Sequence, residues 1–346
     1  MKFVCKVLAL LFSSLMMALP QALPSGGADN PIDPDNGGDP FIAEDLGEYY
    51  YTYTTGGGII LKHIASFCDT TVLASKTVYS AGKDGIVGDI WAPEFHRING
   101  KWYIIASAMF DSNRVEAGIM PREPDSSGDD RYRFGFVLEN VGGGIFGDYI
   151  YRSRLAPGGL SNIDGTYLQR GSALYFVFSG YVGQGWQCIY IVPMENPFTV
   201  KKGAAPVMLS EPQYPWEQHG WRVNEGPAVL ERGGSVYIVY SASGFSSGYY
   251  ALGMLAFKGG SPLCKANWYK SPLPVFSQNP AEKIYNTGHC NFIAVGAQVY
   301  MVYHASRTPS LADSPRATHI QKICFSGDIP VFQKPSRAFN FEKPAA

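Results

Sequence analysis

The hydrophobic and polar positions of the chain repeat a short pattern five times. In each copy, one polar or aromatic residue precedes an apolar stretch, a glycine-containing turn and a second stretch rich in aromatic residues. The copies occupy residues 39–54, 91–107, 164–179, 225–241 and 289–304. Asn-Gly and Gly-Gly pairs in the turns are typical of two-residue β-hairpin loops. Each copy therefore predicts a strand, a tight turn and a second strand.

The five predicted hairpins share a nearly constant spacing. An aromatic residue of the second strand follows the first residue by eleven positions in four copies and by twelve in the copy that begins at residue 225. Successive copies begin 52, 73, 61 and 64 residues apart, which is enough for a four-stranded blade with its loops. Without helical periodicity between them, five such units predict an all-β protein, a five-bladed β-propeller. A β-sandwich rich in tyrosine hairpins is the alternative, but it does not account for the constant spacing.

The two ends of the chain differ from the repeated part. Met1 and Lys2 are followed by a nearly continuous apolar stretch to Ala18, and then by small and turn-forming residues. This order is typical of a secretory signal peptide, and the apolar stretch is short for a membrane span. We therefore expect a signal peptide at 1–26, one propeller domain at 27–346, secretion, and no membrane association. Residues 336–346 look like a tail.

Composition narrows the classes of ligand. Lys and Arg total 28 and Asp and Glu total 29, a net charge of −1, which argues against nucleic acid as a partner. Aromatic residues make up 14% of the chain and charged residues only 16%, which favours a neutral ligand that stacks on rings. Five cysteines follow the signal peptide, so a secreted chain predicts one or two disulfides and a free thiol.

The first residues of the five copies are candidates for a shared site. In a propeller the first strand of each blade lines the central channel, so these residues are expected to meet at one mouth of it. They are Asp39, Trp91, Asp164, Glu225 and His289. Each has an ordinary structural interpretation when taken alone, as a turn residue or as a core aromatic. Their joint position at the starts of all five repeats favours a functional site.

Three carboxylates around one channel suit the hydrolysis of a glycosidic bond with inversion. One carboxyl group protonates the leaving oxygen, and a second, roughly 6.5–9.5 Å away, activates a water on the opposite face of the sugar. A third carboxylate nearby raises the pKa of the acid by repulsion between like charges. Trp91 would offer a flat apolar face on which a sugar ring can stack.

These residues resemble glycoside hydrolase family 43, which holds α-L-arabinofuranosidases, arabinanases and β-xylosidases. The matching segments stand in the family's order: Gly38-Asp39-Pro40-Phe41, Trp91-Ala92-Pro93-Glu94, Ile163-Asp164-Gly165-Thr166, Asn224-Glu225-Gly226-Pro227-Ala228 and Gly288-His289. The resemblance implies that Asp39 is the general base, Asp164 the residue that modulates the pKa of the acid, and Glu225 the general acid.

The resemblance also implies which residues contact the substrate. Trp91 looks like a wall of the sugar pocket, and Phe110 falls near the position of a second aromatic wall. Phe41 belongs to the same segment as the predicted base and is a further candidate. Relatives often present an arginine toward the sugar after the fifth hairpin, where Arg316 is preferred over Arg307.

His289 resembles an axial histidine that contacts a bound ion, commonly calcium, or a water in the channel. Calcium prefers oxygen ligands, so one histidine argues only for partial or indirect coordination, and the chemistry itself requires no cofactor. Relatives commonly have Asn after this histidine, whereas this chain has Cys290. A thiol at that position could alter the ion site, or could be the unpaired cysteine.

Residues 91–104 and 223–244 look most like the branch of the family formed by exo-acting arabinofuranosidases. The resemblance thus implies an inverting exo-α-L-arabinofuranosidase that acts on plant cell-wall arabinan or arabinoxylan. With the N-terminal stretch taken into account, we expect it to be secreted, and we expect a monomer. A β-xylosidase or an endo-arabinanase of the same family is the first alternative. A sugar-binding propeller without catalysis is the second.

Overall fold

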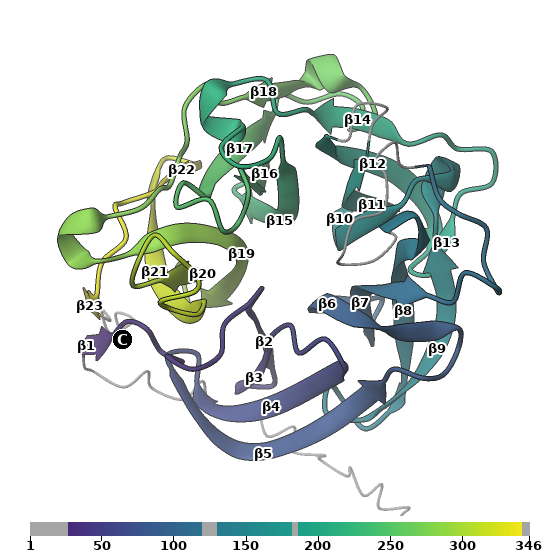
Figure 1. Ribbon diagram of the computed structural model, residues 1–346, viewed down its shortest axis with the longest axis horizontal. Helices are drawn as coiled ribbons and strands as arrows, with labels where there is room; N and C mark the ends of the chain where they lie inside the picture. Colours follow the sequence, from purple (N-terminus) through teal and green to yellow (C-terminus); the bar gives the residue numbers. More distant parts are fainter. Residues whose placement is uncertain (1–26, 120–129, 182–185, 341–346) are drawn as a thin grey trace, which may run out of the picture.

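The computed structural model describes residues 27–119, 130–181 and 186–340, which form a ring of five sheets around a central opening (Figure 1). The predicted five-bladed β-propeller is confirmed. The predicted signal peptide at 1–26 lies outside the described residues. Within the described part, none of the helices has the length and apolar character needed to span a membrane.

Each blade is an antiparallel sheet whose strands follow one another outward in chain order. The first two blades consist of β2 (Phe41–Asp45), β3 (Glu48–Thr52), β4 (Gly58–Ser66) and β5 (Asp69–Ser80), and of β6 (Ile86–Ile98), β7 (Lys101–Phe110), β8 (Arg133–Gly142) and β9 (Asp148–Leu155). The third blade consists of β10 (Asn162–Arg170), β11 (Ala173–Tyr181), β12 (Gln187–Asn196) and β13 (Thr199–Val200), with β14 (Val207–Ser210) also paired to β12.

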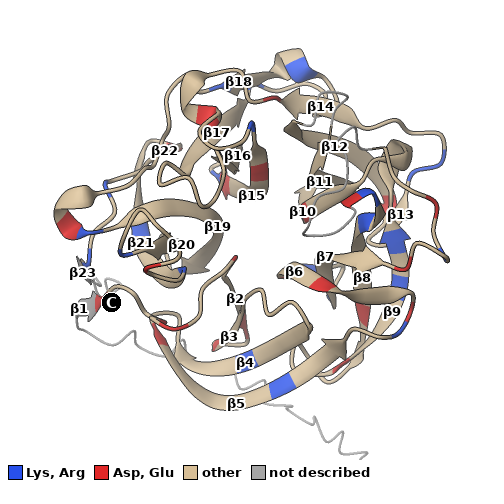
Figure 2. Ribbon diagram, in the orientation of Figure 1, with Lys and Arg blue, Asp and Glu red and all other residues tan. Residues whose placement is uncertain are grey.

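The last two blades complete the ring. They consist of β15 (Asn224–Arg232), β16 (Ser235–Ala242), β17 (Ala251–Phe257) and β18 (Trp268–Lys270), and of β19 (Tyr285–Val295), β20 (Gln298–Ser306), β21 (Ala317–Ser326) and β22 (Ile329–Val331). The described helices are single 3₁₀ turns: Asp130–Tyr132, Pro157–Gly159, Pro215–Glu217, Lys265–Asn267 and Pro280–Glu282. In Figure 2, acidic positions occur on the inner strands β6, β10 and β15 around the central opening.

Every predicted hairpin forms the first two strands of a blade. The turn at Leu46-Gly47 has φ values of 56° and 87°, and the turn at Asn99-Gly100 has 50° and 79°. Positive φ at both central positions defines the type I′ turn, whose twist matches that of the flanking strands. The glycines that marked these turns in the sequence are therefore required by the backbone.

The hydrophobic cores lie between neighbouring blades. Ile59 and Leu61 of the first blade are fully buried in one cluster with Ile104 and Phe136 of the second. Four further clusters of the same kind cover the other contacts between successive blades, including that between the fifth blade and the first. Because each sheet buries both faces against its neighbours, the inner strands are held rigidly around the channel.

The ring is closed by contacts between the two ends of the described chain. β1 (Gly27–Asp29) pairs with β23 (Ala338–Asn340) in an antiparallel ladder. The Asn30 side chain then bonds to both backbone groups of Ile320, at 2.8 Å each. The expectation of a C-terminal tail is therefore corrected for residues 336–340, because this segment contains β23, which pairs with β1 from the N-terminal side of the described chain.

The expected disulfides do not form among the described residues. Cys68, Cys188, Cys264, Cys290 and Cys324 are all free. Cys290 and Cys324 share the fifth blade, but they lie on β19 and β21 with β20 between them. Two strand spacings are about 10 Å, which exceeds the Cα separation that a disulfide can bridge. The odd number of cysteines correctly predicted a free thiol, but not that all five are free.

Candidate active site

The residues that open the five repeats lie where the inner strands are locally distorted. A left-handed backbone occurs at this level in every blade, with φ of 56° at Asp39, 46° at Ala92, 53° at Asp164, 52° at Gly226 and 44° at His289. In four blades the strand pairing also shifts register here, as in a β-bulge. Bulges redirect side chains and are common beside active sites. The distortion places Trp91 and Glu225, each just before a left-handed residue, at the channel mouth.

A cavity of about 550 Å³ opens at this mouth of the channel. Six of the eight predicted site residues line it: Asp39, Trp91, Asp164, Glu225, His289 and Arg316. They come from all five blades, although the first and last of them are separated by most of the sequence. The convergence expected from the repeat positions is therefore what the structure shows.

Asp39 is held as a carboxylate. Arg316 Nη1 donates to its Oδ1 at 2.8 Å, and the Thr54 hydroxyl donates to Oδ2 at 2.7 Å. His289 Nδ1 lies 3.3 Å from Oδ1. Burial raises the pKa of this carboxyl. The opposing effect of Arg316 is larger when combined with those of His289, His304 and the Thr54 hydroxyl, so the pKa lies well below its usual range. Asp39 therefore stays ionised far into the acid range.

Glu225 has the opposite electrostatic environment. Its Oε1 accepts a hydrogen bond from the Tyr250 hydroxyl at 2.9 Å, and its Oε2 accepts one from Gln187 Nε2 at 3.1 Å. Burial, reinforced by the charge of Asp39, raises the pKa of Glu225 to about 7 in spite of these two hydrogen bonds. A large fraction of Glu225 therefore carries a proton at neutral pH.

Asp164 is influenced by both of the other acids. The Gly226 amide donates to its Oδ2 at 3.0 Å, and His289 Nδ1 lies 3.9 Å from the same oxygen. Burial, followed by the charges of Glu225 and Asp39, raises the pKa of Asp164 well above its usual value. Because like charges in one buried site oppose each other's ionisation, Asp164 holds its proton more tightly beside Glu225 than it would alone.

Two close approaches explain glycines in the family-like segments. A Cβ at Gly38 would lie 2.6 Å from Arg316 Nη2, so a larger residue would push the guanidinium away from Asp39. A Cβ at Gly288 would overlap the ring of Tyr250, the tyrosine that bonds to Glu225. Both glycines therefore allow a neighbouring side chain to reach one of the acids.

The surroundings of His289 do not fit a calcium ion held by protein ligands. Its Nδ1 faces Asp39 and Asp164, and its amide donates to Ser241 Oγ at 2.8 Å. Across the described ranges, no group of three or more His, Cys, Asp or Glu side chains could hold a metal ion. Calcium needs six to eight oxygen ligands, so we assign no chemical step to a metal here. Cys290 is buried in the core between the fourth and fifth blades and does not line the cavity.

Trp91 lines the cavity with one face of its ring supported from behind. The guanidinium of Arg133 lies 3.5 Å from the centroid of the Trp91 ring. Arg133 is itself fully buried and is fixed by Asp89 at 3.1 Å and Asp130 at 3.0 Å. A guanidinium stacked on tryptophan and clamped by two carboxylates restricts the ring to one orientation. The other face can therefore serve as a rigid surface for a sugar.

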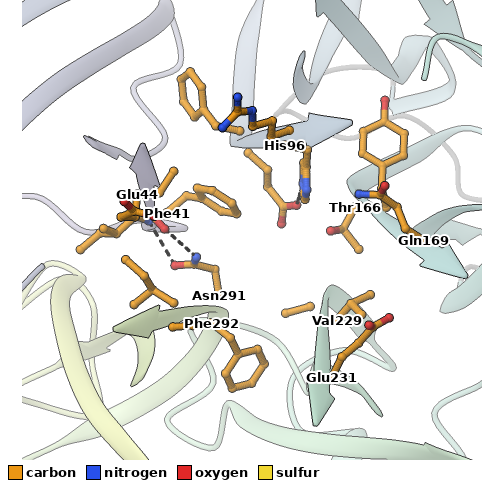
Figure 3. Close-up of a pocket in the computed structure, with 18 of the residues that line it drawn as sticks. Phe41, Glu44, His96, Thr166, Gln169, Val229, Glu231, Asn291 and Phe292 are labelled. Carbon is orange, nitrogen blue, oxygen red and sulfur yellow. Dashed lines mark hydrogen bonds and ion pairs between the residues drawn. The ribbon is translucent and has the colours of Figure 1, made fainter. Parts of the chain in front are cut away.

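Phe41 does not lie in this cavity. It lines a second cavity of about 450 Å³, formed by the later residues of the same inner strands and shown in Figure 3. There its ring lies 5.7 Å from that of His96, and the amide of Asn291 bonds to the backbone of Ile42 (Figure 3). The expectation for Phe41 is therefore corrected. Two residues after Asp39 the strand has moved away from the channel mouth, so the Phe41 side chain faces the second cavity.

Phe110 is also absent from the cavity lining. It is buried in the core between the first and second blades, with its ring edge-on to Phe134 at 6.1 Å. The predicted second aromatic wall is therefore not at this position. Besides Trp91 and Tyr250, the described aromatic residues that line the cavity are Tyr181, Trp186, Trp221 and Phe245.

Sequence reasoning missed the residues that tune the acids and the arginine that supports Trp91. Gln187 begins β12 and Tyr250 directly precedes β17, so both come from the third strands of their blades. Thr54 follows β3, and Arg133 begins β8. Thr54 ends the first copy of the repeated pattern, but nothing in the pattern marks it as a partner of Asp39. The other three positions lie outside the pattern and carry no motif of their own, so their roles become visible only once the third strands are placed beside the channel.

A five-bladed propeller with an ionised carboxylate and a protonated carboxyl in one cavity has the arrangement expected of a glycoside hydrolase. The family model described as "Glycosyl hydrolases family 43" matches residues 28–330. The chain belongs to this family, and the resemblance in its motifs is confirmed.

Several relatives have names that describe their activity. The chain is 30% identical to an "Extracellular exo-alpha-(1->5)-L-arabinofuranosidase" of Streptomyces avermitilis over 89% of its own length, but the match spans only 63% of that relative. It is also 30% identical to a protein of the same name from Streptomyces chartreusis, covering 78% of this chain and 79% of the relative. A solved α-L-arabinofuranosidase from Lactobacillus brevis superposes with a TM-score of 0.79 at 28% identity, covering 91% and 98% of the two chains.

Proposed function

We propose that the protein is a secreted, inverting exo-α-L-arabinofuranosidase that releases L-arabinose from arabinan or from arabinose-substituted plant polysaccharides. The observation that carries this proposal is the contrast between two carboxyls of one cavity. The pKa of Asp39 is held well below its usual range, whereas the pKa of Glu225 is raised to about 7. A base must be ionised and an acid protonated at the same pH, and this pair meets both conditions.

In the proposed mechanism, Asp39 accepts a proton from a water that attacks the anomeric carbon. Glu225 donates its proton to the glycosidic oxygen as the bond to the leaving group breaks. Asp164 is coupled to Glu225, whose charge helps to raise the pKa of Asp164, and we assign Asp164 the role of the residue that modulates the acid. The exposed face of Trp91 would support the sugar ring, and Arg316 would orient the base through their 2.8 Å contact.

The substrate and the location are supported by the relatives. The two Streptomyces relatives are named extracellular exo-acting arabinofuranosidases, and the Lactobacillus brevis structure is titled an α-L-arabinofuranosidase. The N-terminal apolar stretch supports secretion in the same way. We infer action on plant cell-wall polysaccharide as a monomer.

The substrate and the stereochemistry are tested together. The purified protein is expected to release arabinose from linear arabinan and from 4-nitrophenyl α-L-arabinofuranoside, and not xylose from 4-nitrophenyl β-D-xyloside. Proton NMR of the reaction should show the β-anomer of arabinose before mutarotation, because inversion converts the α-linkage. Xylose release would reassign the substrate, and initial α-anomer would exclude the inverting mechanism.

The pH profile follows from the two pKa values. The active form needs Asp39 ionised and Glu225 protonated, so kcat/KM for arabinotriose is expected to be flat in mildly acid solution. Above about pH 7 it should fall tenfold per pH unit, because raising the pH through the pKa of Glu225 removes the catalytic proton.

A variant of Tyr250 tests whether the alkaline fall in kcat/KM is due to Glu225. The Tyr250 hydroxyl stabilises the ionised form of Glu225, so Tyr250→Phe is expected to move the alkaline limb to higher pH. Tyr249→Phe, at a neighbouring position whose side chain is exposed, is the matched control and should leave the limb in place. An alkaline limb that does not move in Tyr250→Phe would assign it to a group other than Glu225.

A further inference from the structure

Arg222 is a cation at the rim of the active-site cavity that has no carboxylate partner among the described residues. Its guanidinium lies 4.5 Å from the centroid of the Trp186 ring, and both residues line the cavity. Throughout the described chain no ion pair involves Arg222, whereas Arg133 and Arg316 are each bound to aspartates. Stacking on Trp186 leaves the edge of the guanidinium, which carries its N–H donors, free for a ligand.

Next to Arg222, Trp221 forms an aromatic platform. Its side chain is 49% exposed, although the ring is held in place from beneath. A Cβ at Gly244 would lie 2.7 Å from Trp221 Cε3, so the ring rests directly on that backbone. The Phe245 ring lies 6.2 Å away and is also partly exposed. An exposed tryptophan fixed in this way is preorganised for stacking on a ligand.

Hydrogen bonds fix the platform to the adjoining loop. The Gly244 amide donates to the His219 carbonyl at 2.8 Å, and the His219 amide donates to Ser243 Oγ at 3.0 Å. The His219 ring in turn stacks on Tyr249 at 4.4 Å. The loop that carries Trp221 and Arg222 is therefore held against the segment 243–249.

A flat aromatic surface beside a free guanidinium suits one kind of sugar. The carbon face of a pyranose ring stacks on an aromatic side chain, and a carboxylate accepts two parallel hydrogen bonds from a guanidinium. A hexuronate carries both features in one unit. The carboxylates of the cavity do not compete for Arg222, because Asp39 is paired with Arg316 and burial raises the pKa values of Asp164 and Glu225.

We propose that Trp221 and Arg222 recognise a hexuronate unit in the part of the polysaccharide that carries the arabinose. This inference rests on the proposed function, because the arabinose in the cavity positions the rest of the substrate against the platform. It makes Arg222 a specificity-determining residue, and it names acidic arabinose-bearing polysaccharides as the favoured substrates.

The test compares each acidic polysaccharide with its neutral counterpart. Arabinose release is measured from glucuronoarabinoxylan and from rhamnogalacturonan with short arabinose side chains, each before and after chemical reduction of its carboxyl groups to alcohols. The wild-type protein is expected to show a kcat/KM roughly fivefold higher for the native form of at least one polymer. The polymer that shows the preference identifies the uronate as glucuronate or galacturonate.

Two variants and a salt series assign the preference to Arg222. Arg222→Gln should bring the ratio of native to reduced substrate close to one, and added salt should lower the wild-type ratio because the contact is exposed. Arg232→Gln, which removes an arginine stacked on Phe325 at the far end of β15, should leave the ratio unchanged. Equal rates on native and reduced forms of both polymers would overturn the inference. Failure to release arabinose from any substrate would instead refute the proposed function.

Discussion

Replacing Asp39 by asparagine is expected to lower kcat by about 10³- to 10⁴-fold for arabinotriose and for 4-nitrophenyl α-L-arabinofuranoside alike. Both reactions need an activated water, and the amide cannot accept its proton. The asparagine oxygen can accept only one of the two hydrogen bonds that Thr54 and Arg316 donate to Asp39, so the fold of the variant is checked separately. The measurement is the initial rate of release of arabinose and of 4-nitrophenolate at about pH 6.

The control for this loss is Asp35→Asn. Asp35 is exposed in the segment just before the site and does not line the cavity. Its variant should keep the wild-type rates on both substrates. Thermal unfolding of both variants distinguishes loss of chemistry from loss of fold. If Asp39→Asn retained more than about a tenth of the activity on either substrate, Asp39 would not be the base.

Replacing Glu225 by glutamine is expected to separate the two substrates. For arabinotriose, kcat should fall by about 10²- to 10⁴-fold, because a sugar alkoxide leaves only when it is protonated. For 4-nitrophenyl α-L-arabinofuranoside the loss should stay within about tenfold, because 4-nitrophenolate is stable without a proton. Glutamine can still accept the hydrogen bond from the Tyr250 hydroxyl, so the variant is a close isostere.

The matched control lies on the same strand. Glu231→Gln makes the same change near the other end of β15, where the side chain is exposed and lines the second cavity (Figure 3). It should leave both rates unchanged. Equal losses on the two substrates in Glu225→Gln, with an unchanged melting temperature, would show that Glu225 acts in a role other than proton donation to the leaving group.

The local pattern was sufficient to predict the architecture. Apolar alternation and turn residues such as Asn99-Gly100 are set by backbone preferences within a few positions, so each hairpin could be recognised alone. The fixed spacing then indicated that the five hairpins occupy the same position in their blades. In a closed ring of blades, the first residues of such hairpins lie around the same mouth of the channel. For this reason the sequence alone predicts that Asp39, Asp164 and Glu225 meet, and all three line one cavity.

The predictions that failed concern side chains whose direction depends on a local distortion or on a neighbouring blade. Phe41 lies two residues after Asp39, whose backbone is left-handed, and its side chain faces the second cavity. Phe110 is buried in the core between the first and second blades. The cysteines could not be paired from sequence, because pairing depends on distances across sheets. Cys290 and Cys324 are separated by an intervening strand, and the number of residues between them does not reveal that separation.

The sequence by itself determined the five-bladed ring, the family and the three carboxyls, because these depend on local hairpin signals and on their regular repetition. Only the tertiary structure decided how each carboxyl is tuned. Asp39 is ionised because Arg316 reaches it from the fifth blade, and Glu225 keeps its proton because burial outweighs its hydrogen bonds. Burial and the approach of charges from distant segments exist only once the ring has closed, so no local pattern encodes them.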